Sequence, residues 1–210
     1  MAEATRGRAL GRPKNTDSAE TRRRILDVAR SAFASGGYDA STNRDLATQV
    51  GITAGALYYY YPSKLDLYLA VHEDVQHRVY GRFNEAAAGA EGFLRKFDAI
   101  LDVAHELNES DPTFAGFIGA TRSDMRRHPE IAASLSGHTE RRDDFFLRLI
   151  DAGVEAGEIE ERNREFTVEF VSIVLIGLTD GVSDDSERHQ RAITSIQMVL
   201  RGDLLTPLEE

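Results

Sequence analysis

The sequence predicts an all-α protein with a three-helix N-terminal domain and a helical C-terminal bundle, about nine helices in total. Apolar residues recur along the 210-residue chain at helical spacing, with little of the alternation typical of strands. Charge and aromatic residues divide the chain: the net charge is +4 over residues 1–65 and −14 over residues 66–210, and all seven tyrosines lie at or before Tyr80. This asymmetry favours a basic module joined to an acidic body, with a chance fluctuation in charge as the alternative.

The first helix is predicted to begin at Asp17. Glu20, three residues later, completes a capping box, apolar residues such as Ile25 and Phe33 then follow at helical spacing, and Gly36-Gly37 ends the helix.

The next two helices are short. Thr42 and Asp45 form a second capping box, and Gly51 ends the helix that they open. Thr53 is a plausible N-cap for the third helix, which is predicted to run until Pro62.

Ser63 and Asp66 open a fourth helix, whose inward positions include Tyr68, Val71 and Val75. Beyond the Ala/Gly-rich break at 86–92, five further helical stretches are predicted, at 92–109, 112–127, 129–157, 163–181 and 186–202.

The second and third helices have the composition of a helix-turn-helix. Ala47 stands four residues before the Gly51 turn, which lets two crossing helices approach closely. The apolar residues that fill the wedge between the helices are Leu46, Val50, Ile52 and Leu57.

With Leu57 pointing into that wedge, helical periodicity turns Tyr61 toward the core and Gly55 and Tyr59 toward solvent. Small residues and phenols on an exposed helix face suit the major groove of DNA, where hydroxyls donate to phosphates. The alternative is that the four consecutive tyrosines are a packing cluster, although no single helix face can bury all four.

The fourth helix begins with Ser63 and Lys64 directly after Pro62. A helix N-terminus with free backbone N–H groups and a lysine can anchor a phosphate. Without other evidence, the same pattern marks only the start of a helix.

Residues 42–67, TNRDLATQVGITAGALYYYYPSKLDL, are similar to the DNA-binding domain of the tetracycline-repressor (TetR) family of bacterial transcriptional regulators. The resemblance covers about the first third of the chain. It implies phosphate contacts from Thr42, Tyr58 and Lys64, and a base contact from Arg44. The groove-facing set that it implies is Gly55, Ala56, Tyr59 and Tyr60, and the predicted DNA-binding residues also include Thr53.

The resemblance also implies a domain organisation. Residues 17–65 would be the DNA-binding domain, 66–205 an effector-binding and dimerisation domain, and 206–210 a tail. Residues 1–16 would be a flexible basic arm, from which Arg12 can reach into a narrow minor groove. A tail with incidental charge is the alternative.

By resemblance, the last two helices form the interface of a homodimer that binds a palindromic operator in double-stranded DNA. Both helices could instead be plain core. The predicted interface residues are Phe170, Val174, Gly177, Leu178, Ile193, Ile196 and Leu200.

A second apolar set is predicted to line a pocket for a small-molecule effector of unknown identity, whose binding would release a repressor from its operator. Aromatic stripes are also typical of ordinary core. The predicted pocket residues are Phe93, Phe97, Leu101, His105, Phe117, Thr121, Met125, Phe146 and Leu149.

Other classes of function are disfavoured. The chain has no cysteine, which excludes disulfides and thiolate metal sites. His72 and His77 are five residues apart, whereas two zinc ligands on one helix face need a spacing of four, so we expect no metal.

No catalytic or phosphate-loop motif is present, so neither an enzyme nor a cofactor is expected. No apolar run approaches membrane-spanning length, which predicts a cytoplasmic protein without membrane contact. A helical scaffold or signalling protein that does not bind DNA is the rival prediction.

Overall fold

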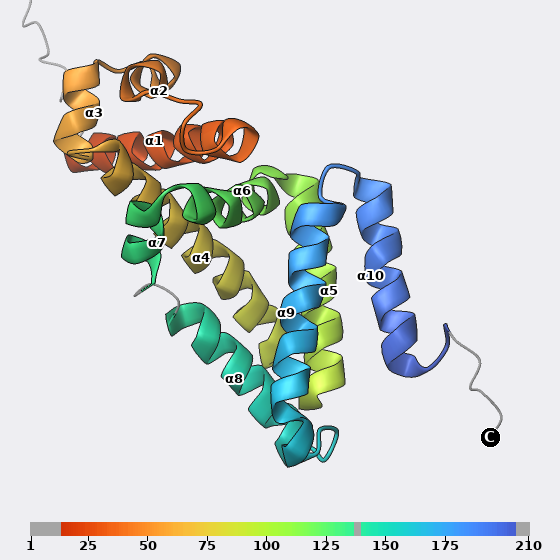
Figure 1. Ribbon diagram of the computed structural model, residues 1–210. Coiled ribbons are helices and arrows are strands. Elements are labelled where there is room, and N and C mark those ends of the chain that lie inside the picture. Colours follow the sequence, from red (N-terminus) through yellow and green to blue (C-terminus); the bar gives the residue numbers. More distant parts are fainter. Residues whose placement is uncertain (1–13, 137–139, 205–210) are drawn as a thin grey trace, which may run out of the picture.

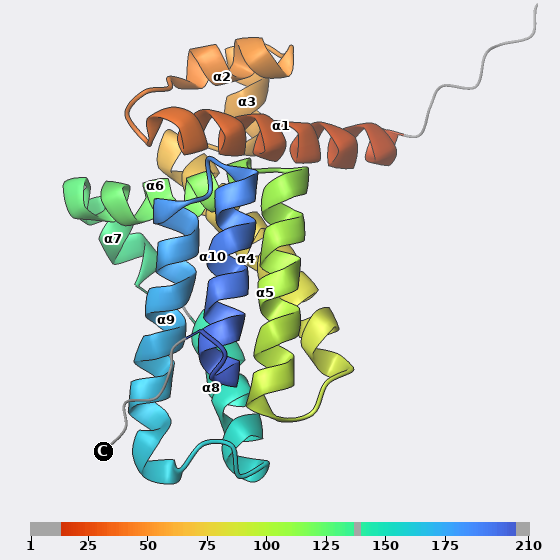
Figure 2. The ribbon, with the colours of Figure 1, turned by 90° about the vertical axis from the view of Figure 1, so that its right-hand side faces the viewer.

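The computed structural model describes residues 14–136 and 140–204, which form ten α-helices, one short 3₁₀ turn and no strand (Figures 1 and 2). The elements are α1 (Lys14–Gly36), α2 (Asn43–Val50), α3 (Ala54–Tyr60), α4 (Lys64–Ala88), α5 (Gly92–Ser110), α6 (Thr113–Arg127), α7 (Pro129–Leu135), α8 (Glu140–Glu155), η1 (Glu161–Asn163), α9 (Arg164–Gly181) and α10 (Ser186–Arg201).

Helices α1, α2 and α3 form a small unit at one end of the molecule (Figure 1). The predicted caps of α2 are confirmed: the Thr42 hydroxyl accepts a hydrogen bond from the Asp45 N–H, and the Asp45 carboxylate accepts one from the Thr42 N–H. Gly51 ends α2 with a φ of +78°, a backbone conformation that residues other than glycine adopt only with strain. The Gly51 cap therefore determines the direction in which the chain leaves α2 toward α3.

The long helix α4 connects this unit to the body (Figure 1). Ser63 is its N-cap, as predicted, and accepts a hydrogen bond from the Asp66 N–H. Because α4 runs unbroken to Ala88, it crosses the domain boundary expected at residue 65. Any shift of α4 within the body therefore moves the attachment point of α3.

In the body, α5, α9 and α10 stand side by side, and α6 crosses their upper ends beneath α1 (Figure 2). α1 and α6 approach closely where Gly116 faces Ala34: a β-carbon at Gly116 would lie 3.3 Å from the Ala34 β-carbon. One apolar core, from Ile25 in α1 to Ile193 in α10, extends through both parts.

Three predictions about the helices are corrected. α1 begins at Lys14 and not at an Asp17 cap, because residues 14–16 contain neither proline nor glycine and extend the helix by a turn. The stretch 129–157 forms two helices, α7 and α8, with Ser136 as the C-cap of α7. Serine is a weaker helix former than the alanines before it in α7, and the described residues contain ten α-helices where about nine are expected. Arg12 lies outside the described residues.

Candidate functional site

The exposed face of α3 consists of small residues and phenol rings. Tyr59 is 85% exposed and Tyr58 48% exposed, and Gly55 between the cap and these rings is also exposed. On the opposite face, Leu57 and Tyr61 are buried. The inward and outward sides of α3 are therefore those that helical periodicity predicts.

The four consecutive tyrosines do not form one packing cluster. Tyr61 is the buried member, and desolvation raises the pKa of its phenol. Tyr60 is half-buried, with its ring edge-on to Tyr59 at a centroid distance of 5.6 Å and the Arg22 guanidinium 5.9 Å away. Two of the four rings thus remain available to solvent on the outer side of α3.

Cations and hydroxyls occur at the starts of α2, α3 and α4. Arg44 and Thr42 are exposed at the start of α2, although the Thr42 hydroxyl is already used in the capping box. Thr53 is exposed and caps α3. The Lys64 ammonium lies 4.1 Å from the centroid of the Tyr38 ring, and burial lowers the pKa of this lysine.

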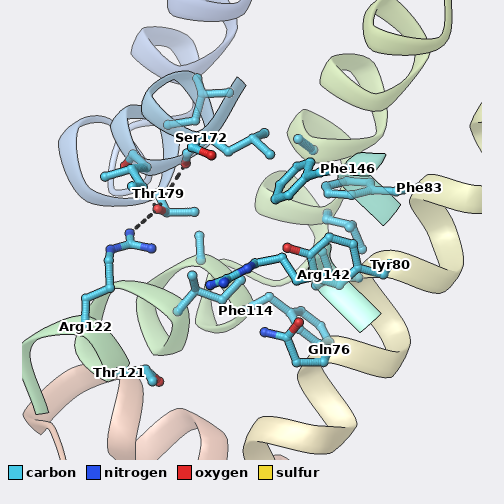
Figure 3. Close-up of a pocket in the computed structure, with 18 of the residues that line it drawn as sticks. Gln76, Tyr80, Phe83, Phe114, Thr121, Arg122, Arg142, Phe146, Ser172 and Thr179 are labelled. Carbon is cyan, nitrogen blue, oxygen red and sulfur yellow. Dashed lines mark hydrogen bonds between the residues drawn. The ribbon is translucent and has the colours of Figure 1, made fainter. Parts of the chain in front are cut away.

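A cavity of about 570 Å³ lies in the body beneath α6, among α4, α5, α8 and α9, with His189 of α10 also in its wall. Figure 3 shows aromatic rings from three helices converging on it. The volume is within the range of about 300–1,000 Å³ found for sites of drug-sized ligands. Its principal apolar and aromatic residues are Val79, Tyr80, Phe83, Phe114, Ile118, Met125, Phe146, Leu175 and Leu178.

The predicted pocket residues divide between the cavity and the core. Thr121, Met125 and Phe146 line the cavity. His105 lies behind the wall, with its Nδ1 3.2 Å from Nδ1 of the cavity residue His189. The other five are core residues that do not line the cavity: Phe93, Phe97, Leu101, Phe117 and Leu149.

Sequence reasoning missed the contribution of α4 to the cavity. Phe83 lies one turn beyond Val79, which continues the inward positions identified at Val71 and Val75, so helical spacing marks Phe83 as inward-facing. Tyr80 directly follows Val79 and lies at the edge of that face, where helical spacing alone does not identify it. In Figure 3 the hydroxyl end of Tyr80 points toward the side where Arg142 approaches. Burial raises the pKa of Tyr80 to about 12, which keeps this phenol protonated and able to donate a hydrogen bond at neutral pH.

The predicted interface residues do not all reach the surface. Leu178 and Ile193 are buried within the protomer, so they cannot contribute area to a contact with another chain. Phe170, Val174, Ile196 and Leu200 are partly buried against the core, and Gly177 is exposed. The large apolar residues exposed on α9 and α10 are instead Phe166, Ile173, Ile176 and Val199.

The described residues offer neither a metal site nor a membrane span. Within residues 14–136 and 140–204, no three acidic or histidine side chains are grouped so that they could hold a metal ion. None of the helices in the same ranges combines the length and apolar character needed to cross a bilayer.

Comparisons with known proteins agree with this geometry. A family model described as "Bacterial regulatory proteins, tetR family" matches residues 25–71. The chain is 25% identical over 177 residues to the HTH-type transcriptional regulator UidR of Escherichia coli (strain K12), covering 84% of this chain and 87% of UidR. It is 36% identical over 89 residues to the HTH-type transcriptional repressor AcnR of Corynebacterium jeikeium, covering 42% of this chain and 47% of AcnR.

A solved structure with a similar fold is that of the transcriptional regulator FadR from Bacillus subtilis in complex with stearoyl-CoA, with a TM-score of 0.75 and 16% identity over 87% of this chain and 99% of that chain. The matched residues 25–71 contain α2 and α3 in full, and these relatives are transcriptional regulators rather than enzymes. The chain therefore belongs to the TetR family of bacterial regulatory proteins and is a DNA-binding transcriptional regulator.

Proposed function

We propose that the protein is a homodimeric repressor that inserts α3 of each protomer into the major groove of a palindromic operator and leaves the DNA when a small molecule fills the cavity. The observation that carries this proposal is the exposed Gly55–Tyr59 face of α3, held by capped helices on a rigid core. A smooth face with small residues allows a helix to approach base edges closely.

The surrounding side chains fit phosphate and base contacts. Tyr58 and Tyr60 flank the outer face of α3, and Arg44 at the start of α2 is exposed and long enough to reach a base edge. Lys64 places its charge at the N-terminus of α4, where free N–H groups also favour a phosphate. Arg12 precedes α1 in sequence and is proposed as a minor-groove contact.

Dimerisation is proposed from the exposed apolar face of α9 and α10. Phe166 is 74% exposed and Ile173 67% exposed, and both lie on α9 two helical turns apart. Large apolar side chains gathered on one face favour burial against another protein surface. Two copies of α3 would then read the two halves of a palindrome.

A small-molecule effector is proposed from the cavity. FadR from Bacillus subtilis was solved in complex with stearoyl-CoA, so a similar fold accommodates a small molecule with a long apolar part. The largely apolar wall of the present cavity is consistent with such occupancy.

Three contacts from α6 connect the cavity to the DNA-binding unit. Phe114 lines the cavity, and its ring lies 4.0 Å from the Arg30 guanidinium of α1. One turn from Met125, Thr121 accepts a hydrogen bond from the Tyr68 hydroxyl of α4.

The third contact is made by Asp124, which is fully buried on α6 and accepts hydrogen bonds from the Tyr38 N–H and the Tyr68 hydroxyl. A ligand that moves α6 therefore moves both ends of the helix-turn-helix unit. The loss of operator affinity can be no larger than the difference between the ligand's affinities for the two positions of α6.

The test is fluorescence anisotropy with duplex DNA from upstream of the protein's own gene. We expect sequence-dependent binding that weakens with salt, and Tyr59→Ala should weaken it at least ten-fold. Lys64→Gln should reduce the slope of log affinity against log salt by about 0.9 for each phosphate that is no longer neutralised. Arg95→Gln, at an exposed cation on α5, is the matched control and should leave both quantities unchanged. The absence of binding to any duplex at low salt would favour the rival, a helical scaffold without DNA-binding activity.

A further inference from the structure

Two side-chain oxygens in the cavity wall are buried and accept no hydrogen bond from the described residues. They are Oε1 of Gln76 on α4 and Oδ1 of Asn108 on α5, and both residues line the cavity. A buried carbonyl oxygen without a donor is unfavourable, because folding removes its hydrogen bonds to water. The wall between α4 and α5 therefore carries acceptors that lack donors.

The orientation of each amide follows from its neighbours. Asn108 Nδ2 donates to the Ser183 carbonyl at 3.1 Å, which directs the amide nitrogen to the loop after α9. The Asn108 Oδ1 atom is then the part of the amide that lacks a partner. Gln76 Nε2 lies 3.4 Å from Nε2 of His72, so its nitrogen is also engaged. Gln76 is only part-buried and has three rotatable side-chain bonds, so its oxygen can follow a donor that enters the cavity.

The cationic side chains of the wall are already paired. Arg122 forms an ion pair with Asp180 and a hydrogen bond to Thr179, as Figure 3 shows for the latter. Arg142 lies 2.9 Å from its neighbour Asp143. A ligand carboxylate would compete with these acids for the guanidinium groups and would lose its own hydration in a largely apolar space.

We infer that the cavity selects an uncharged, largely apolar molecule that carries a hydroxyl donor, with the hydroxyl donating to the Gln76 amide oxygen on the wall that also holds Asn108. This inference rests on the proposed effector function and specifies its ligand class. Because Gln76 belongs to α4, the hydroxyl would contact the helix that begins at the DNA-binding unit. The remaining surface of the ligand would pack on the rings of Tyr80, Phe83 and Phe146.

The test uses three probes with one hydrocarbon skeleton: 4-hexylphenol, 4-hexylanisole and 4-hexylbenzoate. The first has a hydroxyl donor, the second replaces its hydrogen with a methyl group, and the third carries a charge. Dissociation constants are measured by isothermal titration calorimetry with the full-length protein at pH 7.5. We expect 4-hexylphenol to bind about ten-fold more tightly than either analogue.

Two variants and a control locate the hydroxyl. Gln76→Leu removes the acceptor at similar size and should bring the affinities for 4-hexylphenol and 4-hexylanisole within two-fold of each other. Asn108→Leu should reduce the same preference by less, because it changes the same wall but keeps the Gln76 oxygen, and circular dichroism with thermal unfolding establishes that each variant is folded. Gln190→Leu, on the exposed side of α10, is the matched control and should preserve the ten-fold preference.

The outcomes separate this inference from the function on which it rests. Tightest binding of 4-hexylbenzoate, equal binding of the phenol and the anisole, or binding of none of the three would overturn the assigned ligand class. Operator release is followed separately by anisotropy. Tight phenol binding without DNA release would retain the ligand class and contradict effector-controlled repression, whereas release by 4-hexylbenzoate would retain repression and contradict the class.

Discussion

The backbone N–H of Tyr38 donates a hydrogen bond to the Asp124 carboxylate across 2.9 Å. Tyr38 follows α1 in the DNA-binding unit, and Asp124 lies on α6 beside the cavity residue Met125. The same carboxylate accepts from the Tyr68 hydroxyl at 3.0 Å and pairs with Arg127 at 2.8 Å. One fully buried acid therefore joins the turn after α1, the start of α4 and the roof of the cavity.

Asp124→Asn should destabilise the protein by about 1–3 kcal/mol, because the amide has one acceptor oxygen where the carboxylate has two and leaves a buried donor unsatisfied. Urea unfolding followed by circular dichroism measures the change. Asp102→Asn, at an exposed carboxylate on α5, is the matched control and should change stability by less than about 0.5 kcal/mol. Equal effects of the two substitutions would contradict the role assigned to Asp124.

Gly51→Ala should lower the free energy of unfolding by about 1–2 kcal/mol through backbone strain alone. The φ of Gly51 is +78°, and a β-carbon placed there would meet no atom within 4 Å, so steric contact adds nothing. Gly51→Asn should lose less, since asparagine tolerates the left-handed conformation better. If Gly51→Ala proved as stable as the wild type, the turn would adopt another conformation in solution.

Gly55→Ala should have the opposite effect on stability and should impair DNA binding. Gly55 is exposed in α3, and an added β-carbon would lie 4.0 Å from the nearest atom, Thr53 Oγ1. Alanine should therefore match or raise stability, by up to about 1 kcal/mol, because it reduces the entropy of the unfolded chain. The new methyl group should lower operator affinity at least ten-fold in anisotropy measurements. Unchanged affinity would place Gly55 outside the DNA contact.

The caps of the helix-turn-helix unit could be predicted because local chemistry determines them. Thr42 with Asp45, and Ser63 with Asp66, satisfy backbone donors three residues away, so sequence spacing alone specifies the bond. The start of α1 was less predictable. An acidic residue near a helix N-terminus is favourable at several positions of the first turn, so Asp17 did not uniquely mark the cap.

The cavity was only partly predictable, because a helical pattern distinguishes inward from outward positions but not core from cavity. Phe97 and Phe117 are fully buried in the core, whereas Phe114 and Phe146 reach the cavity. Whether an inward-facing ring lies in the core or lines the cavity depends on how far apart α4, α6 and α8 lie, which is a property of tertiary packing. For the same reason, the burial of Leu178 on α9 could not be inferred from its neighbours in sequence.

His189 should make stability depend on pH. Burial, together with the neighbouring His105, lowers the pKa of His189 in the folded protein below its usual value of about 6.5. Between these two values the unfolded chain binds a proton that the folded protein does not, so stability should be full above about pH 6.5 and fall as the pH drops through the folded pKa. Urea unfolding from pH 5 to 8 measures this. His189→Gln should flatten the dependence, and His77→Gln, at an exposed site, should not.

Ile173→Glu should convert the proposed dimer to monomers. Ile173 is 67% exposed on α9, so the substitution leaves the protomer core intact, but a dimer would have to bury the new carboxylate without a partner. Multi-angle light scattering after size exclusion gives the mass, which for the chain is 23.3 kDa per protomer. Leu94→Glu, at a 41% exposed apolar residue on α5, is the control and should leave the mass unchanged. Because a monomer presents a single α3, Ile173→Glu should also weaken binding to a palindromic operator far more than binding to a half-site. If Ile173→Glu stays dimeric, the α9 face is not the interface. Normal operator affinity in that dimer would then place the twofold contact elsewhere on the body.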